Sequence, residues 1–188
     1  MTTPNIPNIP LQLAGRPTAG GFMVPWITAR TPDGRYRFGA VDLDRQNRAL
    51  TDGLCQICGA QLGARIVFAM RDSDLRLLVS PEPGMHPVCA AYSATACPML
   101  AGRMGHYRTT SLAGQLADLG VLPQGDPASL RAGAPAEPWQ LVWVTGYRPF
   151  TNPLTDQLAA LLLPEQILRV RPIGTTSSPN AGTEAAPE

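Results

Sequence analysis

The chain has 188 residues and a mass of 20.0 kDa, with 15 basic against 14 acidic residues and a net charge of +1. Apolar residues make up 44% of it, which is enough for a hydrophobic core, and the neutral balance argues against the strongly basic class of nucleic-acid-binding protein.

Residues 1–19 are interrupted by prolines, and we expect them to form a flexible N-terminal arm. The alternation of Phe22, Val24, Trp26 and Thr28 predicts a strand, and the Pro-Asp-Gly-Arg turn at 32–35 predicts a hairpin that returns through residues 36–38. Residues 42–50 then form a candidate short helix that ends at an Asp-Gly pair.

The segment 54–100 predicts a second hairpin and a helix. Two β-rich runs, 64–70 and 75–79, flank the polar residues 72–74, which is typical of a hairpin. Residues 86–97 are alanine-rich, carry a proline in the first turn and stop before Pro98. A helix tolerates proline in its first turn, and a later proline disfavours helical backbone at the residue before it, so this run predicts a helix of about three turns that ends before Pro98.

The C-terminal half alternates between loop-like and ordered sequence. Residues 112–122 are a candidate short helix, and 123–138 are rich in proline and glycine and predict a loop. Strands are expected at 139–144 and 167–170, with a short helix at 155–163 between them. We therefore expect one domain over residues 20–172 and a disordered tail at 173–188.

Cys55, Cys58, His86 and Cys89 form the pattern C-x2-C-x27-H-x2-C. A spacing of three lets both members of each pair face one ion, and three thiolates with one imidazole suit tetrahedral zinc. Gly59 follows the second cysteine, where a zinc knuckle needs a residue that tolerates positive φ. The second pair lies at the start of the predicted helix, where free amides favour the thiolate.

A knuckle, a hairpin and a helix that carries the second ligand pair follow the order of a treble-clef zinc finger. The fold class predicted is therefore α+β, a small mixed domain built around a treble-clef-like zinc site with flanking antiparallel strands. Disulfide or redox chemistry and four unrelated thiols are the alternatives. Cys97 is a rival ligand, but on an unbroken helix it would lie about 12 Å beyond Cys89, so a small buried residue is the preferred interpretation.

Four protein ligands leave no open position on zinc, so the site is predicted to be structural and no catalytic residue is assigned. The chain contains no HExxH, GxSxG, Walker or Rossmann glycine motif. His106, between Arg103 and Arg108, is the second of the two histidines. It serves either as a solvated loop residue or as the base of a nuclease-like enzyme.

The chain resembles a family of small uncharacterised zinc-finger-like proteins of actinobacteria and their phages. The resemblance rests on four blocks: Val24–Trp26, Cys55–Gly63, Pro81–Pro98 and Trp143–Phe150. It implies a metal site and a bacterial or phage origin, and it carries no activity or substrate.

Two classes of function remain. The first is a non-enzymatic, zinc-stabilised binding protein, and the second is a treble-clef nuclease that uses His106. A protein partner, docked near Tyr147 and Phe150, is favoured over nucleic acid, whose binding would be weak and salt-dependent. The arginines proposed for phosphate contacts are Arg65, Arg76, Arg103 and Arg108.

We expect a cytoplasmic location, because the N-terminus lacks a charged segment and the longest aliphatic run, 158–163, is too short to span a membrane.

Overall fold

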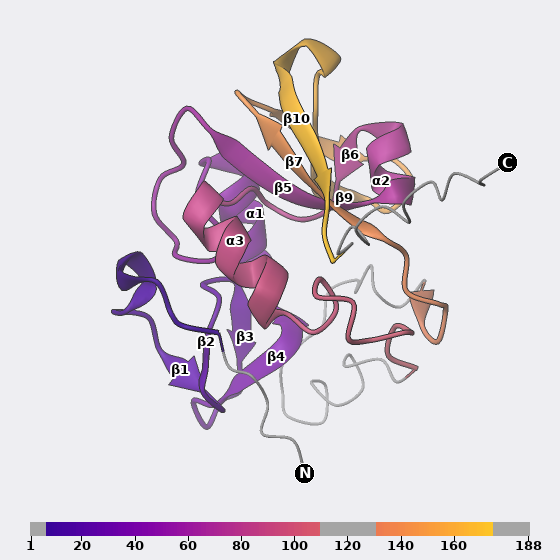
Figure 1. The fold of residues 1–188 in the computed structure, drawn as a ribbon. Coiled ribbons are helices and arrows are strands. Elements are labelled where there is room, and N and C mark those ends of the chain that lie inside the picture. Colours follow the sequence, from indigo (N-terminus) through magenta and orange to yellow (C-terminus); the bar gives the residue numbers. More distant parts are fainter. Residues whose placement is uncertain (1–6, 110–130, 175–188) are drawn as a thin grey trace, which may run out of the picture.

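A computed structural model describes residues 7–109 and 131–174 of the protein as a mixture of short helices and antiparallel strands (Figure 1). The helices are α1 (Leu43–Thr51), α2 (Asp72–Leu77) and α3 (Pro87–Ala96), with 3-10 turns η1 (Leu11–Leu13) and η3 (Pro164–Gln166). The strands are β1 (Thr18–Ala19), β2 (Phe22–Met23), β3 (Thr28–Arg30), β4 (Tyr36–Val41), β5 (Ile66–Arg71), β6 (Val79–Ser80), β7 (Trp139–Val144), β8 (Arg148–Asn152), β9 (Gln157–Leu161) and β10 (Ile167–Pro172). Over these ranges no helix combines the length and apolarity needed to cross a membrane.

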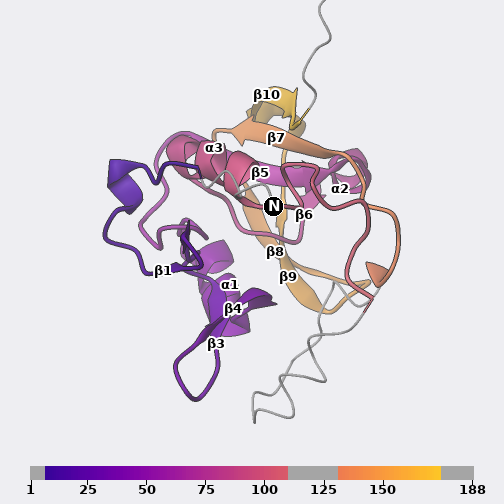
Figure 2. The same ribbon diagram turned by 60° about the horizontal axis from the view of Figure 1, so that its bottom comes forward.

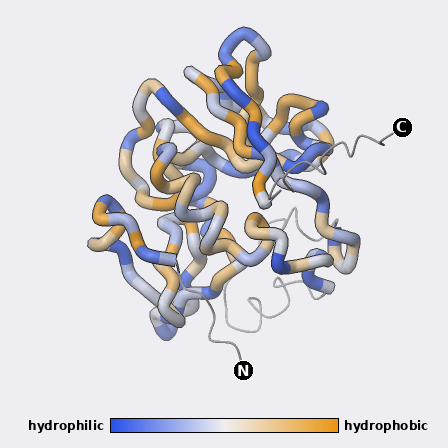
Figure 3. Tube along the Cα trace, in the orientation of Figure 1, coloured by the Kyte–Doolittle hydropathy of each residue, from blue (hydrophilic) through white to orange (hydrophobic). Residues whose placement is uncertain are grey.

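The centre of the fold is the antiparallel sheet β10-β7-β5. One face of β5 and β7, with Val67 and Leu141, packs against α3 and the cysteine pairs. The other face, with Phe68 and Val142, packs against α1 and the second antiparallel sheet, β6-β9-β8. Because β5 is covered on both faces, it is hydrophobic until it reaches Arg71 rather than alternating (Figure 3).

Several predicted elements are confirmed. The β3–β4 hairpin projects from the body of the molecule (Figure 2), with its turn at residues 31–35. Helix α1 begins after Asp42, whose carboxylate accepts a hydrogen bond of 3.2 Å from the Arg45 amide, as an N-cap does. Helix α3 and strands β7 and β10 also lie where the sequence predicted them.

The predicted hairpin of runs 64–70 and 75–79 is wrong. The first run forms β5, but the chain then enters α2, because the Asp74 carboxylate accepts a hydrogen bond of 3.2 Å from the Arg71 amide and so starts a helical turn. Leu78, in the left-handed region at φ +54°, ends α2 and turns the chain into β6. Strand β6 pairs with β9 rather than with β5.

The predicted helix at 155–163 is also wrong, because this run forms β9 in the middle of a sheet. Strand β9 pairs with β8 on one side and with β6 on the other. Ala159 and Ala160 are buried, so each face of the strand packs against the protein. A short apolar run of this kind fits a buried strand and a buried helix equally well, and the pairing partners decide between them.

The predicted strand through residues 22–28 is interrupted. Strand β2 ends at Met23, and Pro25 then directs the chain toward the cysteine knuckle. The amides of Trp26 and Ile27 donate to the carbonyls of Ile57 and Gln56, at 2.9 and 3.2 Å, instead of to a neighbouring strand. This segment is consequently part of the support of the knuckle.

The expected flexible arm, residues 1–19, packs against the domain in its described part. Leu13 is 1% exposed, and β1 pairs with β2. At the other end, the amide of Ile173 donates to the Trp139 carbonyl at 2.9 Å, so the domain extends at least one residue into the predicted tail. The candidate helix 112–122, most of the loop 123–138 and the remainder of the tail lie outside the described residues.

Candidate metal centre

The fold brings together Cys55, Cys58, His86 and Cys89, the four residues that the spacing selected. Their candidate ligand atoms, three Sγ atoms and one imidazole nitrogen, all lie within 4.8 Å of one another. The Cys58 Sγ lies 3.4 Å from the His86 Nδ1. In a tetrahedral zinc site with Zn–S bonds of about 2.3 Å, ligand atoms are about 3.8 Å apart, so the cluster is close to the size of an occupied site.

The first pair lies on a tight turn closed by backbone hydrogen bonds. The Gly59 amide donates to the Cys55 carbonyl, and the Cys55 amide donates to the Ala60 carbonyl, each at 2.8 Å. Gly59 has φ +80°, in the left-handed region, and a Cβ at this position would lie 2.7 Å from the Trp26 ring. Glycine at 59 is therefore required twice, by the turn and by the packing of Trp26.

The second pair lies at the start of α3. His86 is the N-cap residue and Pro87 begins the helix, so Cys89 falls in the first turn. Before the helix, Met85 and Val67 exchange two backbone hydrogen bonds, of 2.8 and 2.9 Å. This pairing anchors the start of α3 to β5 and so sets the position of His86 and Cys89 relative to the knuckle.

A hydrogen bond orients the imidazole of His86. Its Nε2 lies 2.9 Å from the backbone carbonyl of Gln61, so Nε2 carries the proton and donates it to this carbonyl. The lone pair of Nδ1 can then coordinate a metal. Ligating histidines are commonly held through their second nitrogen in this way. Gln61 is a functional contributor that sequence reasoning missed, because a backbone acceptor leaves no signature in residue type.

The thiols of the cluster differ in acidity. A hydrogen bond from the Cys89 thiol lowers the pKa of Cys55 to about 5. Backbone amides that donate to the Cys55 sulfur also lower this pKa. The same bond raises the pKa of Cys89, with burial adding to it. Burial also raises the pKa of Cys58. One thiolate is therefore already formed at neutral pH, and the other two thiols lose protons when a metal binds.

The site is embedded in the core. Cys55 and Cys89 are 0% and 1% exposed, and they pack in one cluster with β5, β7 and α3. Cys58 and His86 are half-buried. An ion in this position would join the knuckle to the start of α3, and four protein ligands would leave it no open position for a substrate.

The other candidate residues lie outside the cluster. Cys97 is the C-cap residue of α3 and is not one of the clustered ligands, and burial raises the pKa of its thiol. All four cysteines are free thiols. His106 is exposed, and its backbone forms an isolated bridge with Pro135. Tyr147, predicted to help form a docking surface, is half-buried, and its hydroxyl donates to the carbonyls of Ala49 and Leu50 at 3.2 and 2.9 Å.

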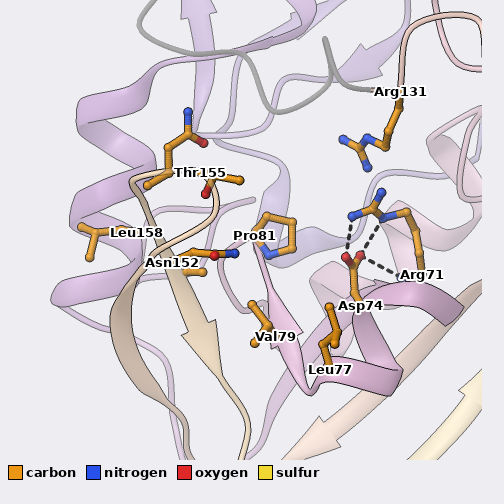
Figure 4. Close-up of a pocket in the computed structure, with 11 residues that line it drawn as sticks. Arg71, Asp74, Leu77, Val79, Pro81, Arg131, Asn152, Thr155 and Leu158 are labelled. Atoms are coloured by element: carbon orange, nitrogen blue, oxygen red, sulfur yellow. Dashed lines mark hydrogen bonds and ion pairs between the residues drawn. The ribbon is translucent and has the colours of Figure 1, made fainter.

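A pocket of about 170 Å³ lies between α2 and the β8–β9 hairpin (Figure 4). On one wall Arg71 forms a bidentate ion pair with Asp74, and its guanidinium also lies 3.7 Å from the Glu137 carboxylate. Asn152 and Thr155 form the facing wall. Among the described residues that line this pocket there is no cysteine or histidine, and Arg71 is paired with carboxylates, so these residues offer no nucleophile paired with a base.

The chain matches no protein-family model, no curated protein and no solved structure. The geometry of the metal cluster is consequently the main basis for a functional conclusion.

Proposed function

We propose that the protein is a non-enzymatic binding protein whose fold is stabilised by one structural zinc ion held by Cys55, Cys58, His86 and Cys89. The observation that carries the proposal is the convergence of these four ligand atoms within 4.8 Å. Zinc binding supplies folding free energy on the order of 10 kcal/mol in small sites of this kind. The paired backbone bonds between Val67 and Met85 support a treble-clef-like arrangement in which an isolated antiparallel bridge between β5 and the residue before His86 stands in place of a hairpin.

A protein partner is proposed over nucleic acid, because much of the arginine charge is used inside the chain. The Arg103 guanidinium donates to the carbonyls of Thr95 and Ala96, at 3.0 and 3.1 Å, and so caps the end of α3. Of the other arginines considered for phosphate contacts, Arg65 and Arg76 are exposed. Within the described residues, the arginines paired with carboxylates are Arg35 with Asp33, Arg45 with Asp42, Arg48 with Asp52, and Arg71 with Asp74 and Glu137.

The apolar surface that supports a protein partner lies beside the pocket of Figure 4. Leu77, at the end of α2, is 68% exposed and lines the pocket. Leu154 precedes the pocket residue Thr155 in the β8–β9 turn and is 86% exposed. Because the hydroxyl of Tyr147 is bonded to α1, we move the proposed docking surface from Tyr147 and Phe150 to these two leucines. Both leucines expose apolar surface that a protein partner would bury.

Nucleic-acid titrations test the choice of partner. With a duplex DNA and a single-stranded RNA, we expect weak binding whose log K falls against log salt with a slope of about −3 to −4. Sub-micromolar affinity at physiological salt would overturn the preference for a protein. For a captured protein partner, Leu77→Asp and Leu154→Asp should each weaken binding, whereas Leu168→Asp, a 55% exposed leucine on β10, should not.

The nuclease alternative depends on His106 and has no specific support in the geometry. Metal-dependent nicking of DNA that is abolished by His106→Ala, with the fold intact, would reverse this conclusion.

We propose a cytoplasmic location, in the host cell if a phage encodes the protein, because reduced thiols suit the proposed metal site. This role fits the resemblance to small zinc-finger-like proteins of actinobacteria and their phages.

A further inference from the structure

The β3–β4 hairpin, which projects from the body of the molecule (Figure 2), carries an excess of positive charge. Residues 28–41 contain the arginines Arg30, Arg35 and Arg37 and a single carboxylate, Asp33. This carboxylate is already paired with Arg35, at 3.2 Å. Within the described residues, Arg30 and Arg37 form no ion pair. The hairpin therefore presents positive charge that the described chain does not neutralise.

Arg108 adds a further positive charge to the hairpin from a distant part of the chain. Its Nη2 donates to the Phe38 carbonyl of β4 at 3.5 Å. Gly39 has φ +84°, and a Cβ at this position would lie 3.3 Å from the Arg108 guanidinium. Arg108 is exposed and, like Arg37, has no carboxylate partner in the part of the chain that the structure describes. The backbone at residues 38–39 thus holds a second unpaired guanidinium beside β4.

Strand β4 also exposes apolar side chains and one edge. Phe38 is 39% exposed and Val41 is 45% exposed. Among residues 7–109 and 131–174, β4 pairs with β3 alone, so its other edge has no neighbouring strand. A strand edge of this kind is a template for pairing with another extended chain. Charge, apolar surface and an open edge therefore occur together on one strand.

These features suit an acidic polypeptide better than a nucleic acid. Sequence-tolerant binding of single-stranded nucleic acid relies on open aromatic faces on which bases stack. Tyr36 is half-buried, and the Arg30 guanidinium covers its ring at 5.1 Å from the centroid. An extended peptide with acidic side chains would instead pair its carboxylates with the free arginines and place apolar side chains against Phe38 and Val41.

We propose that the β3–β4 hairpin and Arg108 form the docking site for an acidic, extended segment of the protein partner. This inference rests on the proposed function, because it names the chemistry of the partner proposed there. The contact is separate from the one assigned to Leu77 and Leu154, which line or border the pocket of Figure 4 and do not belong to the hairpin.

Three variants separate the hairpin from the total charge of the protein. Arg37→Gln and Arg108→Gln each remove one unpaired charge from the proposed site. Arg65→Gln is the matched control, since Arg65 is also exposed but precedes β5, outside the hairpin. All three side chains are exposed, so the substitutions leave the core packing in place.

Fluorescence anisotropy with the full chain and three labelled probes tests the proposal. The probes are a peptide of alternating glutamate and threonine, a matched peptide of alternating lysine and threonine, and a single-stranded DNA of about 15 nucleotides. We expect the glutamate peptide to bind at low salt and the lysine peptide not to bind. Arg37→Gln and Arg108→Gln should each weaken the binding of the glutamate peptide about threefold, and together about tenfold, whereas Arg65→Gln should bind as the wild type does.

Failure of the glutamate peptide to bind, or an equal loss in Arg65→Gln, would overturn the inference and leave the proposed leucine surface standing. DNA bound more tightly than the glutamate peptide, in a manner that needs Arg37 and Arg108, would also overturn it. Leu77→Asp changes only the leucine surface. Peptide binding that survives this substitution and is weakened in the two arginine variants would therefore support the hairpin site independently of that surface.

Discussion

The indole ring of Trp26 lies on the backbone of Gly59, where a Cβ would stand 2.7 Å from the ring atoms. This contact joins the N-terminal strands to the cysteine knuckle, and the Trp26 amide bond to the Ile57 carbonyl, at 2.9 Å, strengthens it. The guanidiniums of Arg45 and Arg48 each lie 5.9 Å from the centroid of the Trp26 ring. The knuckle is therefore built into the domain and is not a separate finger.

Gly59→Ala is expected to destabilise the protein by about 2 kcal/mol or more, because alanine is strained at positive φ and its Cβ would displace Trp26. Gly63→Ala is the matched control, since nothing lies within 4 Å of a Cβ there. Urea unfolding of the metal-loaded proteins measures both. Equal midpoints for the two variants would show that the Trp26 contact is unimportant.

Tyr147→Phe is expected to lower the free energy of unfolding by about 1 kcal/mol. The substitution leaves the carbonyls of Ala49 and Leu50, at the end of α1, without the tyrosine hydroxyl, while it keeps the edge-to-face packing on Phe68. The same urea measurement applies. If stability is unchanged and partner binding is lost instead, Tyr147 belongs to the docking surface after all.

Metal binding is expected to release about two protons near pH 7.5. The pKa of Cys55 is lowered to about 5, so this thiol is already ionised, whereas the raised pKa values of Cys58 and Cys89 keep those thiols protonated until the metal arrives. Because protons and metal compete, affinity rises with pH and is lost on acidification. Calorimetry in buffers of different ionisation enthalpy counts the protons, and a count near zero would contradict the account.

The ligand set was predictable from the sequence because its information is local. Cys55 and Cys58 share one turn, and His86 and Cys89 share one helix start, so each pair was recognisable from its spacing and from the neighbouring Gly59 and Pro87. Chain topology then had to bring two preformed pairs together. Helix α1, with its capping Asp42, was likewise determined by nearby residues.

The elements that were mispredicted depend on distant partners. The run 75–79 carries the residue types of a strand, yet the bonds from Arg71 to Asp74 start a helix, and only Val79 remains to pair with Leu161 of β9. In the same way, β9 is a strand because β6 and β8 lie on either side of it. Contacts between residues so far apart in the chain are not readable from composition or periodicity.

Part of the site could not be found from residue types. The His86 ring is oriented by a carbonyl, that of Gln61, whose position depends on the fold of the knuckle rather than on a residue type. The N-terminal prolines indicated a flexible arm, whereas the burial of Leu13 holds the described part of it against the core. Backbone acceptors and long-range packing are the common reason for these omissions.

Metal analysis of the purified chain and of single cysteine variants tests the central claim most directly. The account predicts one tightly held zinc per chain in the wild type and in Cys97→Ser, because Cys97 lies outside the cluster. Cys58→Ser and Cys89→Ser should lose the metal and, with it, the folding of the knuckle and α3. Loss of zinc from Cys97→Ser together with its retention in Cys89→Ser would contradict the ligand assignment.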